Sequence, residues 1–339
     1  MSKSIELADK ARQMFREEEE EERKVKNSND PRGTVGVRDV RISLSLGPFG
    51  ATLSPAQEFD GFYPPPYGPK AFSDSIRNAT ENTEETNCNT FGDDREAENE
   101  SIRELARFHY ERLKMVFEDE AAWERIDCLA FETVPLTREI VAIRRAVGML
   151  NERIADSDTR RHSSTRSRES DVTKPWWISM VFPDGVFPEM TSRDGSARVS
   201  VRDVVSAATT TPSLALPRPS GLGINCTQAE YLPNLVSQFD DGLRKTLSLS
   251  EGSPHEQYSP LLVLYPNGGD VYDIETQTWI KRPGESSEKQ WAEALRASCA
   301  QVPPSQVWSG VIVGGCCRTT PMHIRSLKET VLSDESWHP

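Results

Sequence analysis

Three cysteines are the residues of this sequence whose type and spacing could do chemistry. Cys226 precedes the adjacent pair Cys316 and Cys317 by 90 positions, and each position follows a short apolar run. Three thiolates favour zinc over magnesium or calcium, and they leave open the fourth position of a tetrahedral site, as in catalytic zinc centres. The spacing by itself leaves a second interpretation open, in which these residues are buried and act as small apolar side chains.

Two polar residues also follow apolar runs, Glu132 after IDCLAF and Asn267 after SPLLVLYP. Glu132 could instead stabilise the N-terminus of the helix that follows, through the helix dipole. Asn267 could simply form the turn in which it stands. The other three cysteines lie in a polar stretch or in apolar patterns, and we expect them to be incidental or part of the core: Cys88, Cys128 and Cys299.

Six strand-like runs, each followed by a helical pattern, would position these residues. The strands are expected within 38–50, 126–134, 175–185, 221–227, 259–270 and 308–317, and the helices near 96–120, 136–154, 199–209, 228–247, 286–300 and 320–331. Apolar strands that alternate with helices predict a parallel sheet covered by helices. Eight such units close a (β/α)8 barrel of the TIM-barrel type, whose functional residues lie at the C-terminal ends of the strands. The pattern predicts an α/β fold of this type with six of the eight units.

The sequence predicts a single domain over 1–339 with a further helix at 4–24. Residues 51–75 are rich in proline, glycine and aromatic residues, which predicts an ordered loop packed over the protein. Polar insertions are expected near 76–95 and 156–171, because these stretches have few apolar residues and no periodicity.

The charge balance excludes some classes of partner. Forty lysines and arginines stand against 53 acidic residues, giving a net charge of −13, which argues against binding to nucleic acid or to an anionic membrane surface. No stretch has the roughly 18 apolar residues of a membrane-spanning helix. The charged N-terminus does not resemble a signal peptide, and six cysteines are too few for a disulfide scaffold, so a cytoplasmic protein is expected.

Five segments carry a family resemblance: LSLGPFGATLSPAQEFDGFY, FETVP, GINCT, YPNGG and GGCC, in this order. The combination resembles the homocysteine S-methyltransferase family, especially its fungal members. The resemblance implies a homocysteine-binding barrel in which Cys226, Cys316 and Cys317 hold zinc and the homocysteine sulfur takes the open position. It further implies that Glu132 binds the amino-acid end of homocysteine and that Asn267 contacts substrate.

The implied reaction is methyl transfer from a sulfonium donor, either S-methylmethionine or S-adenosylmethionine, to homocysteine, giving methionine. The sequence has no GxGxxG loop for a nucleotide, which slightly favours S-methylmethionine. The partners implied are these small molecules, and no oligomeric state follows from the sequence.

The family pattern also includes an initial strand ending in Asp-Gly-Gly and a second strand, and neither motif occurs here. We therefore expect the first two strands to be missing, through an incomplete gene model or a truncated, poorly active form. A catalytically silent zinc-binding remnant with a binding or regulatory role is the alternative function. A third hypothesis is methylation of another thiol or of a selenol.

Overall fold

The computed structural model describes residues 1–29, 39–73, 87–161, 174–211, 216–248, 258–273, 278–280, 288–300 and 307–332. Its centre is a sheet of six parallel strands in the order β1-β2-β3-β4-β5-β8. The strands are β1 (Ser43–Leu46), β2 (Cys128–Val134), β3 (Trp176–Met180), β4 (Gly221–Asn225), β5 (Leu261–Tyr265) and β8 (Gly310–Val313).

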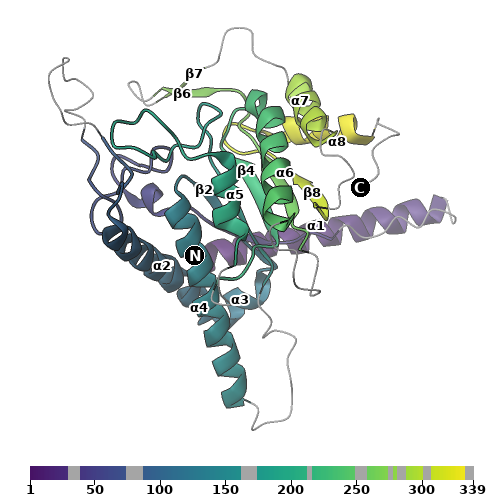
Figure 1. Cartoon of the computed structure of the whole chain (residues 1–339). Helices are drawn as coiled ribbons and strands as arrows, with labels where there is room; N and C mark the ends of the chain where they lie inside the picture. Colours follow the sequence, from purple (N-terminus) through teal and green to yellow (C-terminus); the bar gives the residue numbers. More distant parts are fainter. Residues whose placement is uncertain are drawn as a thin grey trace.

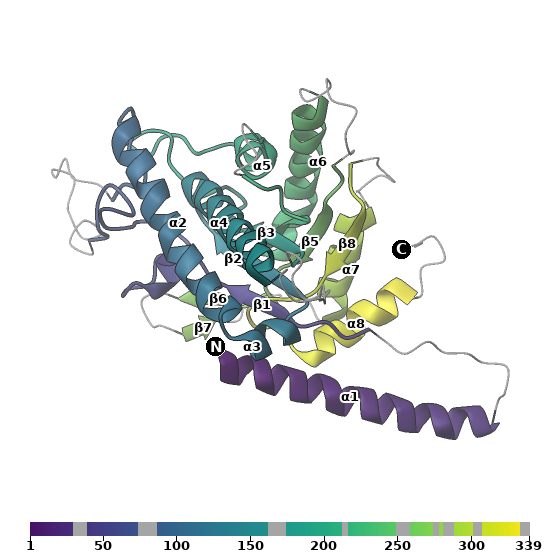
Figure 2. The same ribbon diagram turned by 90° about the horizontal axis from the view of Figure 1, so that it is seen from below.

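A helix follows each of these strands along the chain and covers the outer side of the sheet (Figures 1 and 2). These helices are α2 (Arg95–Phe117), α4 (Thr137–Arg161), α5 (Val201–Thr209), α6 (Leu232–Ser248), α7 (Glu288–Ala300) and α8 (Pro321–Leu332). All six predicted strand-helix units are therefore confirmed, together with the α/β class. The short helices α3 (Glu120–Arg125) and η1 (Phe49–Thr52) were not predicted, nor was the antiparallel hairpin of β6 (Val271–Asp273) and β7 (Thr278–Ile280). The predicted helix at 228–247 begins with the short helix η4 (Ala229–Tyr231) and continues as α6.

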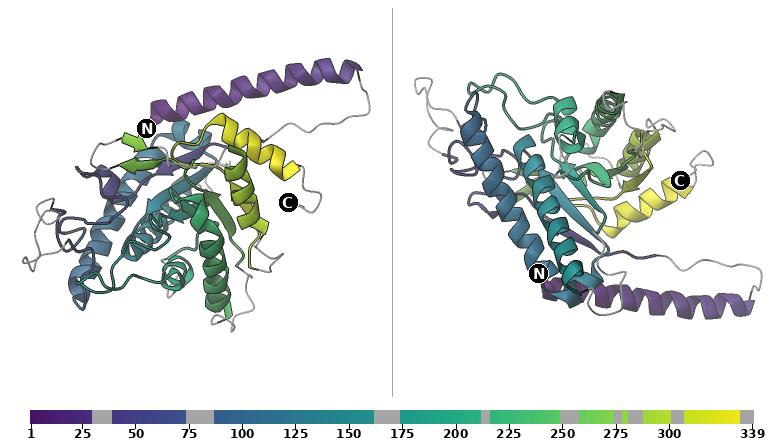
Figure 3. Two further views of the ribbon diagram at one scale, coloured as in Figure 1. Left: turned by 90° about the horizontal axis from the view of Figure 1, so that it is seen from above. Right: turned by 60° about the horizontal axis from the view of Figure 1, so that its bottom comes forward.

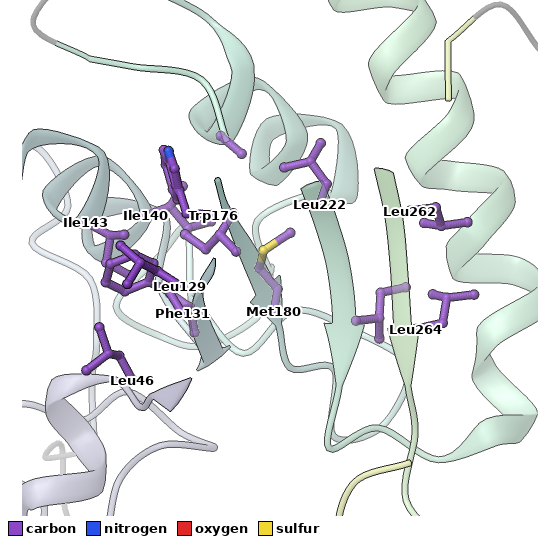
Figure 4. Packing of buried hydrophobic residues seen from close by; sticks show 14 of the residues in the cluster. Leu46, Leu129, Phe131, Ile140, Ile143, Trp176, Met180, Leu222, Leu262 and Leu264 are labelled. Atoms are coloured by element: carbon purple, nitrogen blue, oxygen red, sulfur yellow. The ribbon is translucent and has the colours of Figure 1, made fainter. Parts of the chain in front are cut away.

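The core lies between the sheet and its helices. Side chains alternate between the two faces of a strand, so in β1 Leu44 and Leu46 are buried toward the helices while Ser43 and Ser45 face the other side. Figure 4 shows part of this core, formed by Leu46, Leu129, Phe131, Ile140, Ile143, Trp176, Met180, Leu222, Leu262 and Leu264. Each fully buried large apolar side chain contributes roughly 1.5–3 kcal/mol. This layer holds the strands in register and thereby fixes where their C-terminal ends lie.

The sheet is open. Within the described ranges, β1 pairs only with β2 and β8 only with β5, so these two strands form its edges. On β8, Ile312 points away from the helices and is 40% exposed. Six parallel strands with two free edges are the arrangement that an incomplete (β/α)8 barrel predicts.

Helix α1 (Ser2–Asn29) runs along one side of the protein and extends past it (Figure 3). Its first half is attached through buried Ile5 and through Arg12, whose guanidinium lies 2.8 Å from the Asp127 carboxylate. The helix predicted at 4–24 is therefore confirmed. None of the described helices is long and apolar enough to cross a bilayer.

The loop after β1 is ordered and packs against α4. An ordered loop was predicted for 51–75, and this is confirmed as far as residue 73. Tyr63 is fully buried, and its hydroxyl donates a 2.6 Å hydrogen bond to Glu139 of α4. The backbone N–H of Phe49 donates to the other oxygen of the same carboxylate at 2.7 Å. Leu105 of α2 and Leu136, directly before α4, complete a small second core beneath the loop.

The two predicted insertions are described only in part. Residues 74–86 and 162–173 lie outside the described ranges. Of the first insertion, residues 87–94 form a loop in which Asn89 and Phe91 are buried, and Arg95 begins α2. Residues 156–161 of the second insertion continue helix α4 to Arg161.

Candidate metal centre

The three predicted cysteine ligands meet at the C-terminal ends of β4 and β8. Cys226 directly follows β4, and Cys316 and Cys317 follow β8 after two glycines. The Sγ atom of Cys226 lies 2.7 Å from that of Cys316 and 3.9 Å from that of Cys317, and the Cys316 and Cys317 sulfurs are 4.0 Å apart. Only β5 separates the two strands in the sheet, so parallel order brings their ends together.

The cluster fits a soft metal ion. With zinc–sulfur bonds of about 2.3 Å, two sulfurs of a tetrahedral site lie about 3.8 Å apart. Two of the three distances are close to this value, and the contact between Cys226 and Cys316 is shorter. Cys226 is buried and its two companions are half-buried, so a ligand could still reach the cluster. In the described part of the chain, no other group of three histidine, cysteine or acidic side chains brings its ligand atoms together in this way.

Hydrogen bonding differentiates the thiols. The contact with the Cys226 thiol, followed by that with Cys317, lowers the pKa of Cys316 well below its ordinary value. The same contact with Cys316 raises the pKa of Cys226. Of the three thiols, Cys316 is therefore the one whose ionised form these contacts favour.

A glycine is required in the turn that presents the cysteine pair. A Cβ atom at Gly315 would lie 2.3 Å from Cγ2 of Thr319, far inside van der Waals contact. Thr319 closes the turn, because its backbone N–H and its hydroxyl both donate to the carbonyl oxygen of Cys316, at 3.1 and 2.6 Å. Gly315 therefore lets the backbone turn closely enough to present both cysteines.

The loop after β5 braces the same turn. The N–H of Cys316 donates to the carbonyl of Pro266, and the N–H of Gly268 donates to the carbonyl of Cys317, both at 2.8 Å. A Cβ atom at Gly268 would lie 2.6 Å from the carbonyl oxygen of Arg318, so a larger residue would push the loops apart. Three loops thus share one hydrogen-bonded assembly, since the N–H of Asn267 also donates to Thr227, which follows the first cysteine, at 2.9 Å.

Asn267 itself is 8% exposed, and its carbonyl accepts a 2.9 Å hydrogen bond from the indole of Trp291. Its side-chain oxygen is buried and has no hydrogen-bond partner among the residues that the structure describes. The backbone of Asn267 therefore has a bracing role, and the predicted contact of Asn267 with substrate stays a prediction.

Glu132 lies at a bulge in β2. Phe131 pairs with Ile178 and Val134 with Met180, so two residues of β2 stand opposite one residue of β3. Bulges redirect side chains and are common beside active sites. The Glu132 carboxylate accepts a 2.7 Å hydrogen bond from the hydroxyl of Ser45.

The surroundings of Glu132 raise the pKa of its carboxyl group. Burial is the main cause, the hydrogen bond from Ser45 opposes it, and the nearby negative charge of Cys316 adds to the rise. The hydroxyl of Tyr265 at the end of β5 also opposes the rise. The next residue, Thr133, contacts the sulfur of Cys226 at 3.6 Å, so Glu132 lies close to the cysteine cluster. One small substrate could therefore be bound by Glu132 and by the cluster together.

Three residues of the site were not predicted from the sequence. The Tyr265 hydroxyl shares a hydrogen bond with Ser179 and accepts another from the Trp177 indole at 3.3 Å, yet in the sequence it is only the end of an apolar strand. Asn225 and Thr133 contact each other and Cys226. The one visible signal for Asn225 is an amide at the end of the apolar run GLGI.

The chain is similar to known proteins along nearly its whole length. The family model described as homocysteine S-methyltransferase matches residues 1–331. Homocysteine S-methyltransferase 3 of Arabidopsis thaliana is 26% identical over 99% of this chain and 69% of its own length. Selenocysteine Se-methyltransferase of Brassica oleracea var. italica is 25% identical over 99% of this chain and 68% of its own length. Homocysteine S-methyltransferase YbgG of Bacillus subtilis is 28% identical over 85% of this chain and 63% of its own length.

Among solved structures, the metallated form of the homocysteine methyltransferase MmuM from Escherichia coli is similar, with 19% sequence identity and a TM-score of 0.44. The match covers 96% of this chain and 71% of that one. Because the family model extends over nearly the whole sequence, this chain belongs to the homocysteine S-methyltransferase family.

Proposed function

We propose that this protein transfers a methyl group from a sulfonium donor to the thiolate of homocysteine and so forms methionine. The observation that carries the proposal is the convergence of Cys226, Cys316 and Cys317, whose sulfurs all lie within 4.8 Å of one another although they come from separate strand ends. The relatives named as homocysteine S-methyltransferases support the same reaction.

In this proposal the three cysteines hold a zinc ion. Their soft sulfur donors and half-open position support zinc over magnesium or calcium. A free thiol has a pKa near 8.5 and is mostly protonated at neutral pH, whereas the thiolate is the nucleophile. Zinc bound here would supply the positive charge that keeps the homocysteine thiol ionised.

Glu132 binds the amino group of homocysteine in this proposal. Its carboxylate is held by Ser45 at 2.7 Å and lies beside the cysteine cluster, so it can pair with an ammonium group while the substrate sulfur points toward the cysteines. Holding both ends of a small substrate restricts the sulfur to the geometry needed for attack. A contact of Asn267 with the same substrate is the weaker part of the proposal.

The chemical step forms one bond and breaks one. The homocysteine thiolate attacks the methyl carbon of the sulfonium, a carbon–sulfur bond forms, and the electron pair of the broken bond stays on the donor sulfur. The donor leaves as a neutral thioether, so its departure needs no proton from the protein. We favour S-methylmethionine as donor, because the sequence lacks a GxGxxG nucleotide loop.

Two further features belong to this proposal. Residues 1–339 form one homocysteine-binding unit with polar insertions near 76–95 and 156–171, and the protein acts in the cytoplasm. A selenol is a second candidate for the methyl acceptor, supported by the relatives named as selenocysteine methyltransferases.

The test is an assay of the purified chain with homocysteine and S-methylmethionine, before and after removal of metal by a chelator. The proposal expects methionine formation that is lost with the metal and restored by zinc. S-adenosylmethionine and selenocysteine in parallel assays decide the donor and acceptor. A chain that binds zinc but never forms methionine would contradict the proposal and select the catalytically silent zinc-binding alternative.

A further inference from the structure

We propose that Asn225 is a positioning residue that ties the Glu132 segment to Cys226 and so sets the distance between the site for the substrate amino group and the metal-binding sulfurs. The inference rests on the proposed function for the roles of Glu132 and Cys226. Its own basis is a set of contacts made by one buried amide.

The side chain of Asn225 is fully buried, and its hydrogen bonds reach Thr133 and the cysteine cluster. Its Oδ1 accepts a 2.8 Å hydrogen bond from the backbone N–H of Thr133, the residue next to Glu132. Its Nδ2 donates to the hydroxyl oxygen of Thr133 at 2.8 Å and to the sulfur of Cys226 at 3.2 Å. The same nitrogen also lies 3.9 Å from the sulfur of Cys316. An amide nitrogen carries two hydrogens, so one can serve Thr133 while the other points toward the sulfurs.

The two residues that the amide holds both have left-handed backbones. Thr133 has φ 59° and Cys226 has φ 50°, a region that residues other than glycine rarely adopt and that is especially unfavourable for a β-branched threonine. Such conformations persist where surrounding contacts hold them, and they cluster at active sites. The hydroxyl of Thr133 adds a direct contact to the Cys226 sulfur at 3.6 Å.

The contact between Asn225 and Thr133 joins two strands that are not neighbours in the sheet. Strand β3 lies between β2 and β4, so the link from Asn225 to Thr133 passes over the C-terminal end of β3. No β-ladder joins these two strands directly, and the amide supplies the connection on the side where the site lies. It also fixes the bulge of β2, which directs the Glu132 side chain.

A role confined to packing would not require an amide here. Asn225 ends the apolar run GLGIN, where an aliphatic side chain would fill the space without the cost of burying polar atoms. Groups that hydrogen-bond to metal ligands orient them, and their removal typically lowers metal affinity or activity about 10–100-fold. The donor at 3.2 Å from the Cys226 sulfur is placed for this role.

The test compares Asn225→Ala with Thr133→Val and with Asn89→Ala as the matched control. Thr133→Val keeps the shape of the side chain and removes only the hydroxyl. Asn89 is also fully buried and holds loops through Asp60, Pro188 and Met190, away from the cysteines. Each purified variant is measured for zinc affinity by competition with a chromophoric chelator, and for the KM of homocysteine and of S-methylmethionine.

For Asn225→Ala we expect zinc affinity to fall about 10–100-fold and the KM of homocysteine to rise more than that of the donor. Thr133→Val should shift both quantities in the same direction by less. Asn89→Ala should lower the melting temperature and leave zinc affinity at the wild-type value.

The inference is wrong if both Asn225→Ala and Thr133→Val keep the wild-type zinc affinity and the wild-type KM of homocysteine. That result would not affect the proposed function. An equal loss of zinc affinity in Asn89→Ala also overturns the inference, because the effect would then follow from general destabilisation. If Asn225→Ala does not fold, Thr133→Val decides. A wild-type chain that neither binds zinc nor forms methionine contradicts the proposed function, and this inference with it.

Discussion

The sulfur atoms of Cys226 and Cys316 lie 2.7 Å apart although 90 positions separate the two residues in the chain. The contact exists because β4 and β8 flank β5 in a parallel sheet, so their C-terminal ends open on the same side. The metal site therefore depends on the register of three strands. It also depends on the loop after β5, which braces the cysteine pair through Pro266 and Gly268.

Replacement of one cysteine tests the metal site. Cys316→Ser should lose bound zinc and methionine formation together, because a serine hydroxyl does not replace a thiolate as a soft ligand. Metal analysis of the purified variant and the methyl-transfer assay measure the two losses. Cys128→Ser is the control, since this half-buried cysteine lies at the opposite end of β2 from the site. Zinc retention with normal turnover in Cys316→Ser would remove the case for this ligand set.

Replacement of the glutamate tests substrate binding. Glu132→Gln should raise the KM of homocysteine about 10- to 100-fold and leave the KM of the sulfonium donor nearly unchanged, because a hydrogen bond to a charged group contributes about 1.5–3 kcal/mol. Ser45→Ala should have a smaller effect in the same direction, since Ser45 donates to this carboxylate. Ser43→Ala removes a hydroxyl from the same face of β1 and should have none. Equal increases in both KM values for Glu132→Gln would argue against binding of the amino group.

Two adjacent glycines give a sharp steric comparison. Gly315→Ala should destabilise the protein by about 1–3 kcal/mol and weaken zinc binding, because the new Cβ would clash with Thr319 at 2.3 Å and open the cysteine turn. Gly314→Ala should be tolerated, since the atom nearest to its new Cβ is Cβ of Tyr265 at 3.8 Å. Denaturant unfolding and chelator competition measure both effects. A variant pair with indistinguishable zinc affinities would contradict the proposed turn geometry.

The buried pair of His109 and Glu139 predicts loss of stability in acid. Burial lowers the pKa of His109 below its ordinary 6.5. Burial alone would raise the pKa of Glu139, but hydrogen bonds from His109, Tyr63 and the Phe49 N–H bring it below its ordinary 4.5. Both groups bind protons more tightly in the unfolded chain. The two groups stabilise the folded protein fully above pH 6.5. As the pH falls, the contribution of His109 is lost first, and that of Glu139 is lost below pH 4.5.

The melting temperature should therefore decrease as the pH is lowered from 7 toward 5. In His109→Gln the side-chain amide can still donate to Glu139 but does not titrate, so the decrease between pH 7 and 5 should be shallower than in the wild type. Parallel slopes for the two proteins would show that another group causes the acid sensitivity.

The main elements could be predicted because each strand and helix has a periodic apolar pattern. The run IDCLAFETV and the helix after it correspond closely to β2 and α4. The hairpin of β6 and β7 could not be predicted, because each strand has three residues and neither alternates clearly. The cysteines could be grouped in advance, since they end different strands of a parallel sheet and share a preference for soft metals.

The roles of Asn225, Thr133 and Tyr265 could not be predicted in the same way. A left-handed backbone at Thr133 has no sequence signature, since threonine seldom adopts it. The contact between Thr133 and Asn225 joins residues 92 positions apart, and no periodicity carries that information. Tyr265 ends an apolar strand and looks like a core residue until its hydroxyl is placed beside Ser179 and Glu132.

X-ray absorption at the zinc edge of the metal-loaded wild-type protein tests the central claim most directly. The account predicts three sulfur neighbours at about 2.3 Å from the zinc, and a fourth sulfur when homocysteine is added. A zinc environment of nitrogen and oxygen alone, or one unchanged by homocysteine, would contradict it.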